Sequence, residues 1–437
     1  MSGFGQPYWW DGQPAPPKLS TLPERAELLI IGAGYTGLSA AIAAASSGAD
    51  VCVVDAEHPG FGASSRNGGM AGAHPRLSLS VMTERFGAST ARQVFNEAGM
   101  AFDYFEGLIK SFKIDCDYKQ SGRVQLAWTK ADFEAQKRMA EEMNRDTDYA
   151  VTVLEQEDLP QHLKTDHYFG GLYYPNHGSL HPKKFVDGLL RVALKLGVKV
   201  VGNMPITRLQ RTTRGFIAEG PHDSLRADKV LVATNGYTFG VGVMNFIKRR
   251  VFPLPSYLIA TEKLPKALIQ ELAPGGRMMV ETRARHSYWR ISPDGNRVIW
   301  GGRASIQQID PARAAKQLQK TMTEIWPQLA GAAITHAWKG NTGYTFSEAP
   351  HVGEENGIVF AAGYCGGGVV LAPYLGMKAA YRLLGDARGE TAYNHTTLAT
   401  RPYHLGTRPW FLTPANYWYH WLVDTRQNVR AREDRKR

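Results

Sequence analysis

The sequence predicts an α/β fold in which a Rossmann-like nucleotide-binding domain is joined to a second, β-rich domain built on antiparallel sheet. Near the N-terminus, a short apolar run, a glycine-rich turn and an alanine-rich segment follow one another. That order is typical of a strand, a turn and a helix. The chain has 437 residues, which is more than one simple core usually holds. A central stretch rich in Tyr, Trp and Arg predicts the strands of the second domain.

The first βαβ unit is the clearest local pattern. Residues 28–31 form a short apolar run typical of a buried parallel strand, residues 36–47 predict a helix, and residues 51–54 predict a second buried strand. Residues 28–49 are uncharged and long enough to suggest a membrane span. Their glycines and hydroxyl side chains favour the strand–turn–helix interpretation instead, so we expect no membrane span.

Helical and strand patterns alternate along the rest of the chain. Helices are predicted over residues 80–150, with a strand interrupting at 122–127, from Pro182 to about 196, over 312–326, and from a glycine cluster to about 384. Further strands are predicted at 198–201, 206–210, 215–219, 229–233 and 358–362, and residues 245–310 are predicted to be mostly β.

Composition excludes several functional classes. The formal net charge is +11, but no basic patch is interleaved with aromatic residues, so we expect no nucleic-acid partner. An anionic substrate is one interpretation of the charge, and an ordinary solvated basic surface is the other.

The three cysteines, Cys52, Cys116 and Cys365, form no CxxC pair. This spacing argues against a disulfide framework or a metal site and favours a cytoplasmic protein. The first 25 residues contain no apolar signal segment.

The first chemical motif is Gly32-Ala33-Gly34-Tyr35-Thr36-Gly37. It follows a predicted strand and opens a predicted helix, which is the context a dinucleotide-binding fingerprint requires. The glycines allow a tight turn, close approach of a pyrophosphate and close helix–strand packing. Asp55 ends the next strand, where its carboxylate can accept hydrogen bonds from ribose hydroxyls and repel a 2′-phosphate. The motif therefore predicts a dinucleotide other than NADP.

A second glycine-rich loop follows at residues 62–69, with the sequence GASSRNGG. Its backbone can lie against the rest of an extended dinucleotide, and Arg66 can contact a phosphate or the electron-rich edge of a flavin. An ordinary surface loop is the alternative interpretation. An enzyme that binds only NAD has no obvious use for this loop, so an NAD-dependent dehydrogenase is disfavoured.

With these motifs the chain resembles the D-amino-acid oxidase family of FAD-dependent oxidoreductases, and within it the gamma-glutamylputrescine oxidase-like branch. The resemblance rests on residues 8–10 (YWW), 32–40 (GAGYTGLSA), 62–69, 233–237 (ATNGY) and 363–368 (GYCGGG), in that order along the chain. It implies bound FAD, with Ile206 near the adenine and residues 363–369 approaching the isoalloxazine ring. Together with the first motif and Asp55, the predicted FAD-binding residues are Ala63, Ser64, Arg66, Asn67, Gly68, Gly69, Ile206, Ala233, Thr234, Asn235, Gly363, Gly366, Gly367, Gly368 and Val369.

The resemblance also implies a discontinuous domain organisation. Residues 26–80, 181–244 and 335–395 are predicted to form the FAD-binding domain, and residues 81–180 and 245–334 the substrate domain. Residues 1–25 are predicted to be an N-terminal arm, and residues 396–437 a C-terminal extension.

The chain departs from the family pattern at residues 340–345. Amino-acid oxidases of this family often carry an arginine there for the substrate carboxylate, but the sequence here is GNTGYT. A simple α-amino acid is therefore a doubtful substrate. The same stretch has no cysteine that could link the flavin, so we predict noncovalent FAD. His74 could form a histidyl link, but a surface or capping histidine is favoured.

Substrate contacts are predicted in the β-rich stretch. Arg290 could clamp a carboxylate or phosphonate, and Tyr288 would share its strand face. A solvent-facing salt bridge is the alternative for Arg290. Tyr257 and Tyr344 could wall the cavity or simply pack in the core. Lys339 could lie near the flavin. No residue is singled out as catalytic, because in this chemistry the flavin accepts the hydride while the protein binds and orients the substrate.

The predicted function is FAD-dependent oxidation of the C–N bond of a small amine or amino acid, and the basic net charge allows a substrate that bears an anionic group. The imine would hydrolyse to an aldehyde or keto acid, and O2 would take the electrons to give H2O2. A dehydrogenase with another electron acceptor and a non-catalytic flavoprotein subunit are the alternatives.

Overall fold

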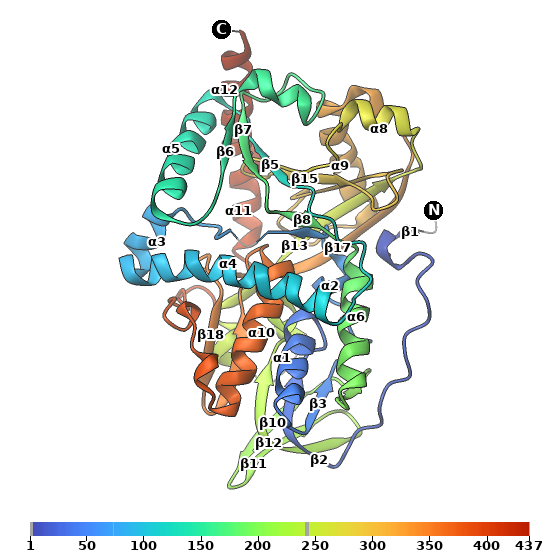
Figure 1. Ribbon diagram of the computed structural model, residues 1–437, viewed down its shortest axis with the longest axis vertical. Helices are drawn as coiled ribbons and strands as arrows, with labels where there is room; N and C mark the ends of the chain where they lie inside the picture. The colour runs from blue at the N-terminus through green and yellow to red at the C-terminus, as the bar shows by residue number, and fades with distance from the viewer. Residues whose placement is uncertain (1–2, 73, 241–243, 437) are drawn as a thin grey trace.

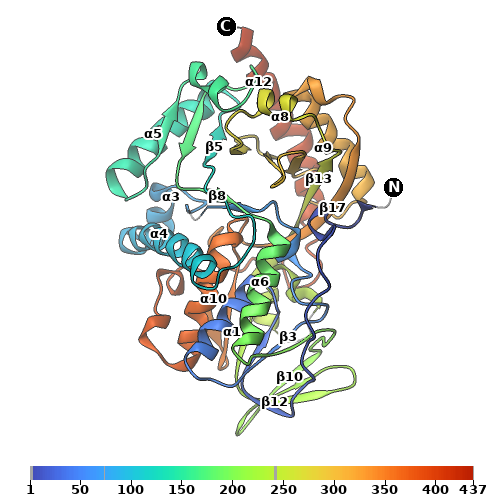
Figure 2. The same cartoon turned by 45° about the vertical axis from the view of Figure 1, so that its right-hand side comes forward.

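The computed structural model describes residues 3–72, 74–240 and 244–436. Two large sheets dominate it, one in the lower and one in the upper half of the molecule (Figures 1 and 2). The predicted combination of a Rossmann-like unit and a β-rich unit is confirmed.

The lower sheet has eight strands, and its centre is parallel. The path β10-β11-β12-β2-β3-β9 carries parallel pairs from β12 to β9, and β19 pairs with β12 in parallel and with β18 antiparallel. The strands are β2 (Arg25–Ile31), β3 (Val51–Val54), β9 (Lys199–Val201), β10 (Arg208–Thr212), β11 (Gly215–Glu219), β12 (Ser224–Val232), β18 (His351–Glu355) and β19 (Ile358–Ala362).

Three helices pack on this sheet (Figure 1). They are α1 (Tyr35–Ser46), α6 (Pro182–Lys195) and α10 (Gly368–Leu384). The helices α1 and α10 lie very close together, since a Cβ added at Gly376 would be 2.2 Å from the carbonyl oxygen of Thr36. The segment that resembled a membrane span is β2 and α1. Within the described ranges, no helix is both long enough and apolar enough to cross a membrane.

The upper sheet has nine strands in the order β1-β17-β13-β16-β15-β14-β5-β7-β6, and most of its pairs are antiparallel. Its strands are β1 (Gly3–Phe4), β5 (Arg123–Leu126), β6 (Thr152–Leu154), β7 (Gly171–Tyr174), β13 (Val251–Thr261), β14 (Met278–Glu281), β15 (Ser287–Ile291), β16 (Val298–Gly302) and β17 (Ile334–Thr345). A small two-stranded sheet, β4 (Met70–Ala71) with β8 (Gly178–Ser179), lies between the halves (Figure 1).

The remaining helices surround the upper sheet and the junction between the halves. They are α2 (Ala63–Arg66), α3 (Leu79–Phe86), α4 (Ala88–Ser111), α5 (Lys130–Asp146), α7 (Asn245–Lys248), α8 (Lys266–Leu272), α9 (Pro311–Ile325), α11 (Leu412–Trp418) and α12 (Asp424–Lys436). Short 3-10 turns include η1 (Tyr8–Trp10), and a π-helical turn, η7 (Tyr419–Val423), joins α11 to α12. The helix α8 interrupts the stretch that was predicted to be mostly β.

Strand pairing differs from the predicted domain boundary at residue 335. Although residues 335–395 were assigned to the FAD-binding domain, β17 pairs with β13 in the upper sheet over eleven register positions. The reason is that the backbone N–H and C=O groups of β17 hydrogen-bond to β13. The sequence pattern within residues 335–345 does not reveal which strand is the pairing partner. The predicted arm also contributes to this sheet, since β1 pairs with β17. The C-terminal extension packs on the same unit, where Asn428 Oδ1 accepts a hydrogen bond of 3.2 Å from Trp128 Nε1.

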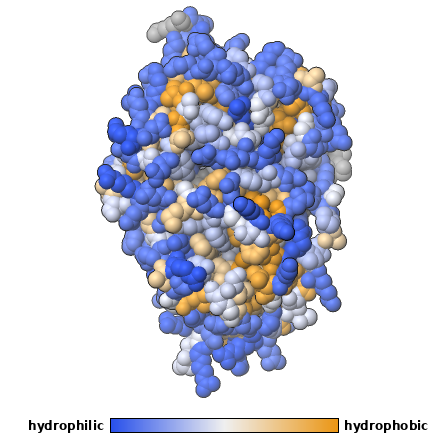
Figure 3. All heavy atoms as spheres, viewed as in Figure 1, coloured by the Kyte–Doolittle hydropathy of each residue, from blue (hydrophilic) through white to orange (hydrophobic). Residues whose placement is uncertain are grey.

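The core follows the two halves. One large cluster surrounds α1, α6 and α10, and a second lies beneath the upper sheet with α9. Hydrophilic side chains cover most of the face in Figure 3, and apolar side chains gather in patches between them. The loops at the junction of the halves lie between these two hydrophobic cores.

Candidate active site

The turn after β2 needs its glycines for steric reasons. Gly32 has φ +108°, and a Cβ there would lie 2.9 Å from the carbonyl oxygen of Ala233. A Cβ at Gly37 would lie 1.8 Å from the carbonyl oxygen of Gly32, and one at Gly34 would lie 2.8 Å from Ser64 Oγ. The turn is thus pressed against both the 62–69 loop and the end of β12, so the sequence motifs meet in space.

Hydrogen bonds join the predicted cofactor loops. Tyr35 N donates to Ser64 Oγ at 2.9 Å. Gly363 N donates to Asn235 Oδ1 at 2.9 Å, which ties the end of β19 to the loop after β12. Thr36 Oγ1 and Tyr364 OH lie 2.7 Å apart. The four glycine-bearing or polar loops therefore form one continuous surface at the carboxyl ends of the parallel strands, where such sheets bind ligands.

Two helix N-termini open on this surface, each with glycine as its N-cap residue, although Ser64 Oγ accepts a hydrogen bond from Tyr35 N, the first N–H of α1. The N-cap residues are Gly34 for α1 and Gly367 for α10, and neither makes a side-chain cap hydrogen bond. Uncapped N–H groups together with the helix dipole favour a negatively charged ligand. One of the two suits a pyrophosphate, and the other suits negative charge on a reduced flavin.

Asp55 stands at the end of β3, as predicted. Its Oδ2 accepts a hydrogen bond of 2.7 Å from Ala33 N, and its Oδ1 accepts one of 3.0 Å from Glu57 N. Burial raises the pKa of Asp55 to about 6, despite these two hydrogen bonds. Ile206 lies just before β10, and its side chain packs in a core cluster with Val54 and Val232.

The 62–69 loop is held by the aromatic arm. The Arg66 guanidinium lies 4.6 Å from the Trp10 ring and 4.4 Å from the Phe61 ring, and its Nε donates to Phe61 O at 2.8 Å. Trp9 Nε1 donates to Asn67 O at 2.8 Å. Residues 8–10 therefore hold the 62–69 loop in place, which is a physical reason for the two segments to occur in the same chain.

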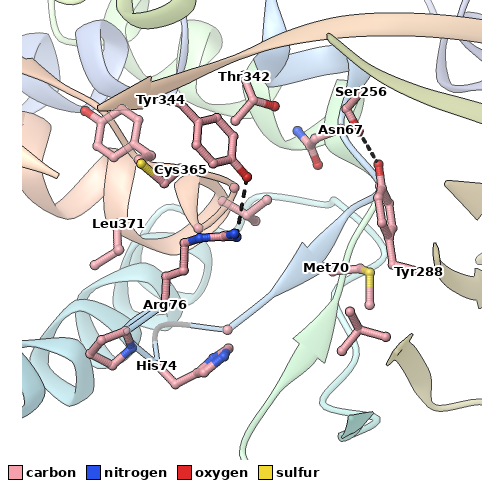
Figure 4. Close-up of a pocket in the computed structure, with 18 of the residues that line it drawn as sticks. Asn67, Met70, His74, Arg76, Ser256, Tyr288, Thr342, Tyr344, Cys365 and Leu371 are labelled. Carbon is pink, nitrogen blue, oxygen red and sulfur yellow. Dashed lines mark hydrogen bonds between the residues drawn. The ribbon is translucent and has the colours of Figure 1, made fainter. Parts of the chain in front are cut away.

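A cavity of about 510 Å³ lies between the two halves of the molecule, and we call it the inner cavity. Figure 4 shows a close-up of residues that line it. Among the predicted FAD- and substrate-binding residues, those that line it are Ala63, Arg66, Asn67, Gly68, Gly366, Gly367, Val369, Tyr288 and Tyr344. The other predicted FAD-binding residues are not among those that line it.

Tyr344 holds two arginines that the sequence analysis did not assign to substrate. Its hydroxyl accepts hydrogen bonds from Arg303 Nη2 at 2.6 Å and from Arg76 Nη1 at 3.4 Å (Figure 4 shows the second). Arg76 also pairs with Glu348 at 3.1 Å. All four residues line the inner cavity. Arg76 lies a few residues after the second glycine loop, and this closeness in sequence could have indicated that its side chain lines the cavity.

Tyr288 and His286 form another part of the wall. Tyr288 OH and Ser256 Oγ lie 2.9 Å apart (Figure 4), and a Cβ at Gly68 would be 3.0 Å from the Tyr288 ring. Burial, and then the nearby Arg303, lower the pKa of His286 well below its usual value. This imidazole is therefore neutral at neutral pH.

Arg290 and Tyr257 do not line the inner cavity, contrary to the prediction. Arg290 does share the strand face of Tyr288, but it is buried. Its Nη1 donates to Gly69 O at 2.9 Å and to Leu180 O at 2.7 Å. Its hydrogen bonds thus join the segments around Gly69 and Leu180 and are not directed at the cavity. Tyr257 is also buried, and its hydroxyl bonds to the backbone of residues 307 and 309 at 2.8 Å each.

Two other residues, His74 and Lys339, differ in position from the sequence-based interpretation. His74 lines the inner cavity and is not a surface or capping residue. Lys339 donates to Gln308 Oε1 at 2.6 Å and is not among the residues lining the cavity. Cys365 belongs to residues 363–369, which the resemblance places near the isoalloxazine ring; it lines the cavity within the last glycine turn, and burial raises the pKa of its thiol. A protonated thiol is a poor nucleophile.

The family of FAD dependent oxidoreductases called DAO matches residues 27–382. The chain belongs to this family. It is therefore an enzyme, an FAD-dependent oxidoreductase, as the resemblance implied. The residues present also fit FAD on structural grounds, because the two helix N-termini, the fused glycine turns and Asp55 lie on one surface. Among the described residues, no group of three or more His, Cys, Asp and Glu side chains is placed to hold a metal ion.

Relatives of known name cover most of the chain. The probable oxidoreductase OrdL of Rhizobium meliloti is 32% identical over 386 residues, which are 87% of this chain and 88% of the relative. Gamma-glutamylputrescine oxidoreductase of Escherichia coli is 29% identical over 370 residues, which are 84% of this chain and 85% of the relative. Among solved structures, glycine oxidase from Geobacillus kaustophilus superposes with a TM-score of 0.72 at 19% identity, covering 87% of this chain and 100% of that one. This superposition confirms the predicted fold.

Proposed function

We propose that this oxidoreductase oxidises the C–N bond of a small amine with noncovalently bound FAD and passes the electrons to O2. The observation that carries the proposal is the inner cavity. It joins the two predicted flavin-binding loops, at Asn67 and at Gly366, to a wall of tyrosine and arginine side chains. The gamma-glutamylputrescine oxidoreductase at 29% identity supports an amine substrate.

When bound, FAD supplies the two-electron acceptor for this chemistry. The chain's own residues bind and orient the amine. Tyr288 and Tyr344 give the cavity its shape, and neutral His286 can accept a hydrogen bond from an N–H of the substrate. The positive charge of Arg303 favours the unprotonated amine by like-charge repulsion, and only that form can release its α-hydrogen as hydride. Arg76 adds less to this effect, because Glu348 pairs with it. The resulting imine would hydrolyse to an aldehyde or keto acid.

The proposed division of labour follows the two sheets. The eight-stranded sheet with α1 and α10 would hold FAD, and the nine-stranded sheet, including β17, would face the substrate. Noncovalent attachment stays part of the proposal: Cys365 is buried in the last glycine turn, and burial raises the pKa of its thiol. His74 also lines the inner cavity, so a histidyl link is the alternative that acid precipitation tests. The cytoplasm remains the proposed location, on the ground that Cys52, Cys116 and Cys365 are all buried free thiols.

The test starts from the visible spectrum of the purified protein. We expect flavin bands that remain in the native protein and pass into the supernatant after acid precipitation, as noncovalent FAD would. Flavin bands that stay with the precipitate would contradict noncovalent attachment.

Anaerobic titration with a panel of amines should then bleach the flavin, and readmitted air should restore it with one H2O2 per turnover. Free FAD under the same conditions is the control. Bleaching without H2O2 would indicate a dehydrogenase with another acceptor. No bleaching across primary, secondary and amino-acid amines would indicate a non-catalytic flavoprotein.

A further inference from the structure

Arg123, at the start of β5, lines the inner cavity although no carboxylate pairs with it. Its Nη2 lies 2.8 Å from His74 Nε2, and its guanidinium lies 4.5 Å from the centre of the Tyr174 ring. Among the ion pairs of the described residues, none involves Arg123, whereas Arg76 in the same cavity pairs with Glu348. Glu281 also lines the cavity, but it is bonded to Arg283. Arg123 is therefore a cation without a counter-ion in the cavity wall.

A buried cation without a counter-ion costs free energy, so it needs a reason to be retained. Burial lowers the pKa of Arg123, but guanidinium remains protonated at neutral pH. The ring and hydroxyl of Tyr174 and the imidazole of His74 are neutral partners, so they compensate only part of the lost hydration. An anion entering the cavity would supply the missing counter-ion.

Two neutral imidazoles complete this part of the wall. Burial and the charge of Arg123 lower the pKa values of His74 and His177 well below the usual range. His74 Nδ1 and both ring nitrogens of His177 are buried and have no hydrogen-bond partner in the structure. Because a neutral imidazole keeps one N–H donor, the pair adds hydrogen-bonding capacity without adding charge.

The position of this cluster sets the geometry of a ligand. Figure 4 shows Asn67, Thr342 and Cys365 along one side of the inner cavity and His74 on the other. Asn67 and the turn around Cys365 belong to the predicted flavin-binding loops. An anion at Arg123 would therefore lie away from the end where the C–N bond is expected to react.

We propose that Arg123 and His74, with His177 behind them, form a subsite for a carboxylate of the substrate. This inference rests on the proposed amine oxidation and names its substrate class: amines whose carboxylate lies several bonds from the oxidised C–N bond. The planar fork of arginine matches a carboxylate. An α-amino acid holds its carboxylate on the reacting carbon, so it cannot occupy both ends of the cavity.

The test compares matched substrates in the holoenzyme. The ω-amino acids β-alanine, γ-aminobutyrate, δ-aminovalerate and ε-aminocaproate are each paired with the n-alkylamine that lacks the carboxylate, and glycine is included. We expect the native enzyme to prefer at least one ω-amino acid over its alkylamine by about tenfold or more in kcat/KM, mainly through KM. No preference at any chain length would overturn the subsite.

Arg123→Gln should reduce that preference about 10- to 100-fold, toward a ratio of one. A purely structural role would lower both members of each pair equally and leave the ratio unchanged, which would also overturn the proposal. Arg277→Gln is the matched control. Arg277 lies over the neighbouring Tyr173 ring at 5.1 Å and has a buried, unpartnered Nε, but it is not among the residues lining the cavity. The control should retain the native ratio.

Valerate, an unreactive carboxylate, gives a readout that does not need turnover. Its binding is followed by the change in the flavin spectrum, and its Kd should rise about 10- to 100-fold in Arg123→Gln. If no amine bleaches the flavin but this shift occurs, amine oxidation fails and the carboxylate subsite stands. If Arg123→Gln does not fold, Arg123→Lys decides the matter. It keeps the charge but loses the fork, and an unchanged Kd for valerate would refute the subsite.

Discussion

Replacing Arg290 with Met tests whether this arginine holds the fold together or binds substrate. The side chain donates three hydrogen bonds to backbone carbonyls, including 3.0 Å from Nε to Ile291 O. Met keeps an unbranched stem of similar reach but cannot donate. Two of the lost bonds join Gly69, which ends the second glycine loop, to Leu180, just before α6. We therefore expect Arg290→Met to destabilise the protein and to weaken FAD retention.

The magnitude follows from two opposing effects. Hydrogen bonds from a charged donor contribute roughly 1.5–3 kcal/mol each. Against this, burial lowers the pKa of Arg290 to about 10, and a lowering of that size costs the charged form about 3 kcal/mol. The net loss in Arg290→Met should be of the order of 3 kcal/mol. For a chain of 437 residues this lowers Tm by about 3 °C.

The assays are thermal unfolding and the temperature at which flavin fluorescence appears, combined with steady-state kinetics on the best amine. Arg226→Met is the control, because Arg226 is exposed on β12 and should change neither value. The reasoning would be refuted by a KM that rises tenfold or more in Arg290→Met while Tm and flavin retention stay native. That result would show that Arg290 binds the substrate.

Two further predictions concern the cofactor loops. Because burial raises the pKa of Asp55 to about 6, the carboxylate is lost as the pH falls through that value. FAD affinity of the apoprotein should therefore drop below about pH 6. Asp55→Asn should bind FAD more weakly at pH 7 and show no such pH dependence in a fluorescence titration, and a retained pH dependence would contradict the assignment. Gly37→Ala should abolish FAD binding, because its Cβ would lie 1.8 Å from Gly32 O and push α1 away from β2. Gly99→Ala in α4 is the control: a Cβ there meets nothing within 4 Å, so unfolding should show a gain of about 0.5–1 kcal/mol. FAD bound normally to Gly37→Ala would disprove the close-packing argument.

Much of the fold was predictable because its signals are local. A buried parallel strand, a glycine turn and an alanine-rich helix each depend on residues adjacent in sequence, and β2, the turn at Gly32 and α1 lie where those signals placed them. Gly32, Gly34 and Gly37 are required because a Cβ at each would meet atoms of the same turn or of the segments beside it. These signals predicted a bound dinucleotide, and the resemblance carried by the same motifs implied the family and FAD.

The substrate side of the site was less predictable, and the arginines show why. The β-rich stretch offered several, and sequence alone favoured Arg290, whose alternation with Tyr288 was correct. Only strand pairing and the position of the β4–β8 sheet decided that Arg290 meets the carbonyls of Gly69 and Leu180 while Arg303 reaches Tyr344.

The sequence by itself thus determined the FAD-binding half, because glycine turns and strand periodicity are short-range properties of the backbone. The tertiary structure alone decided which polar side chains share the inner cavity. Arg123 meets His74 across 49 residues of sequence, and Arg303 meets Tyr344 across 41. Such contacts depend on how distant strands and loops pack against one another, and a side chain's destination is not encoded in the residues beside it.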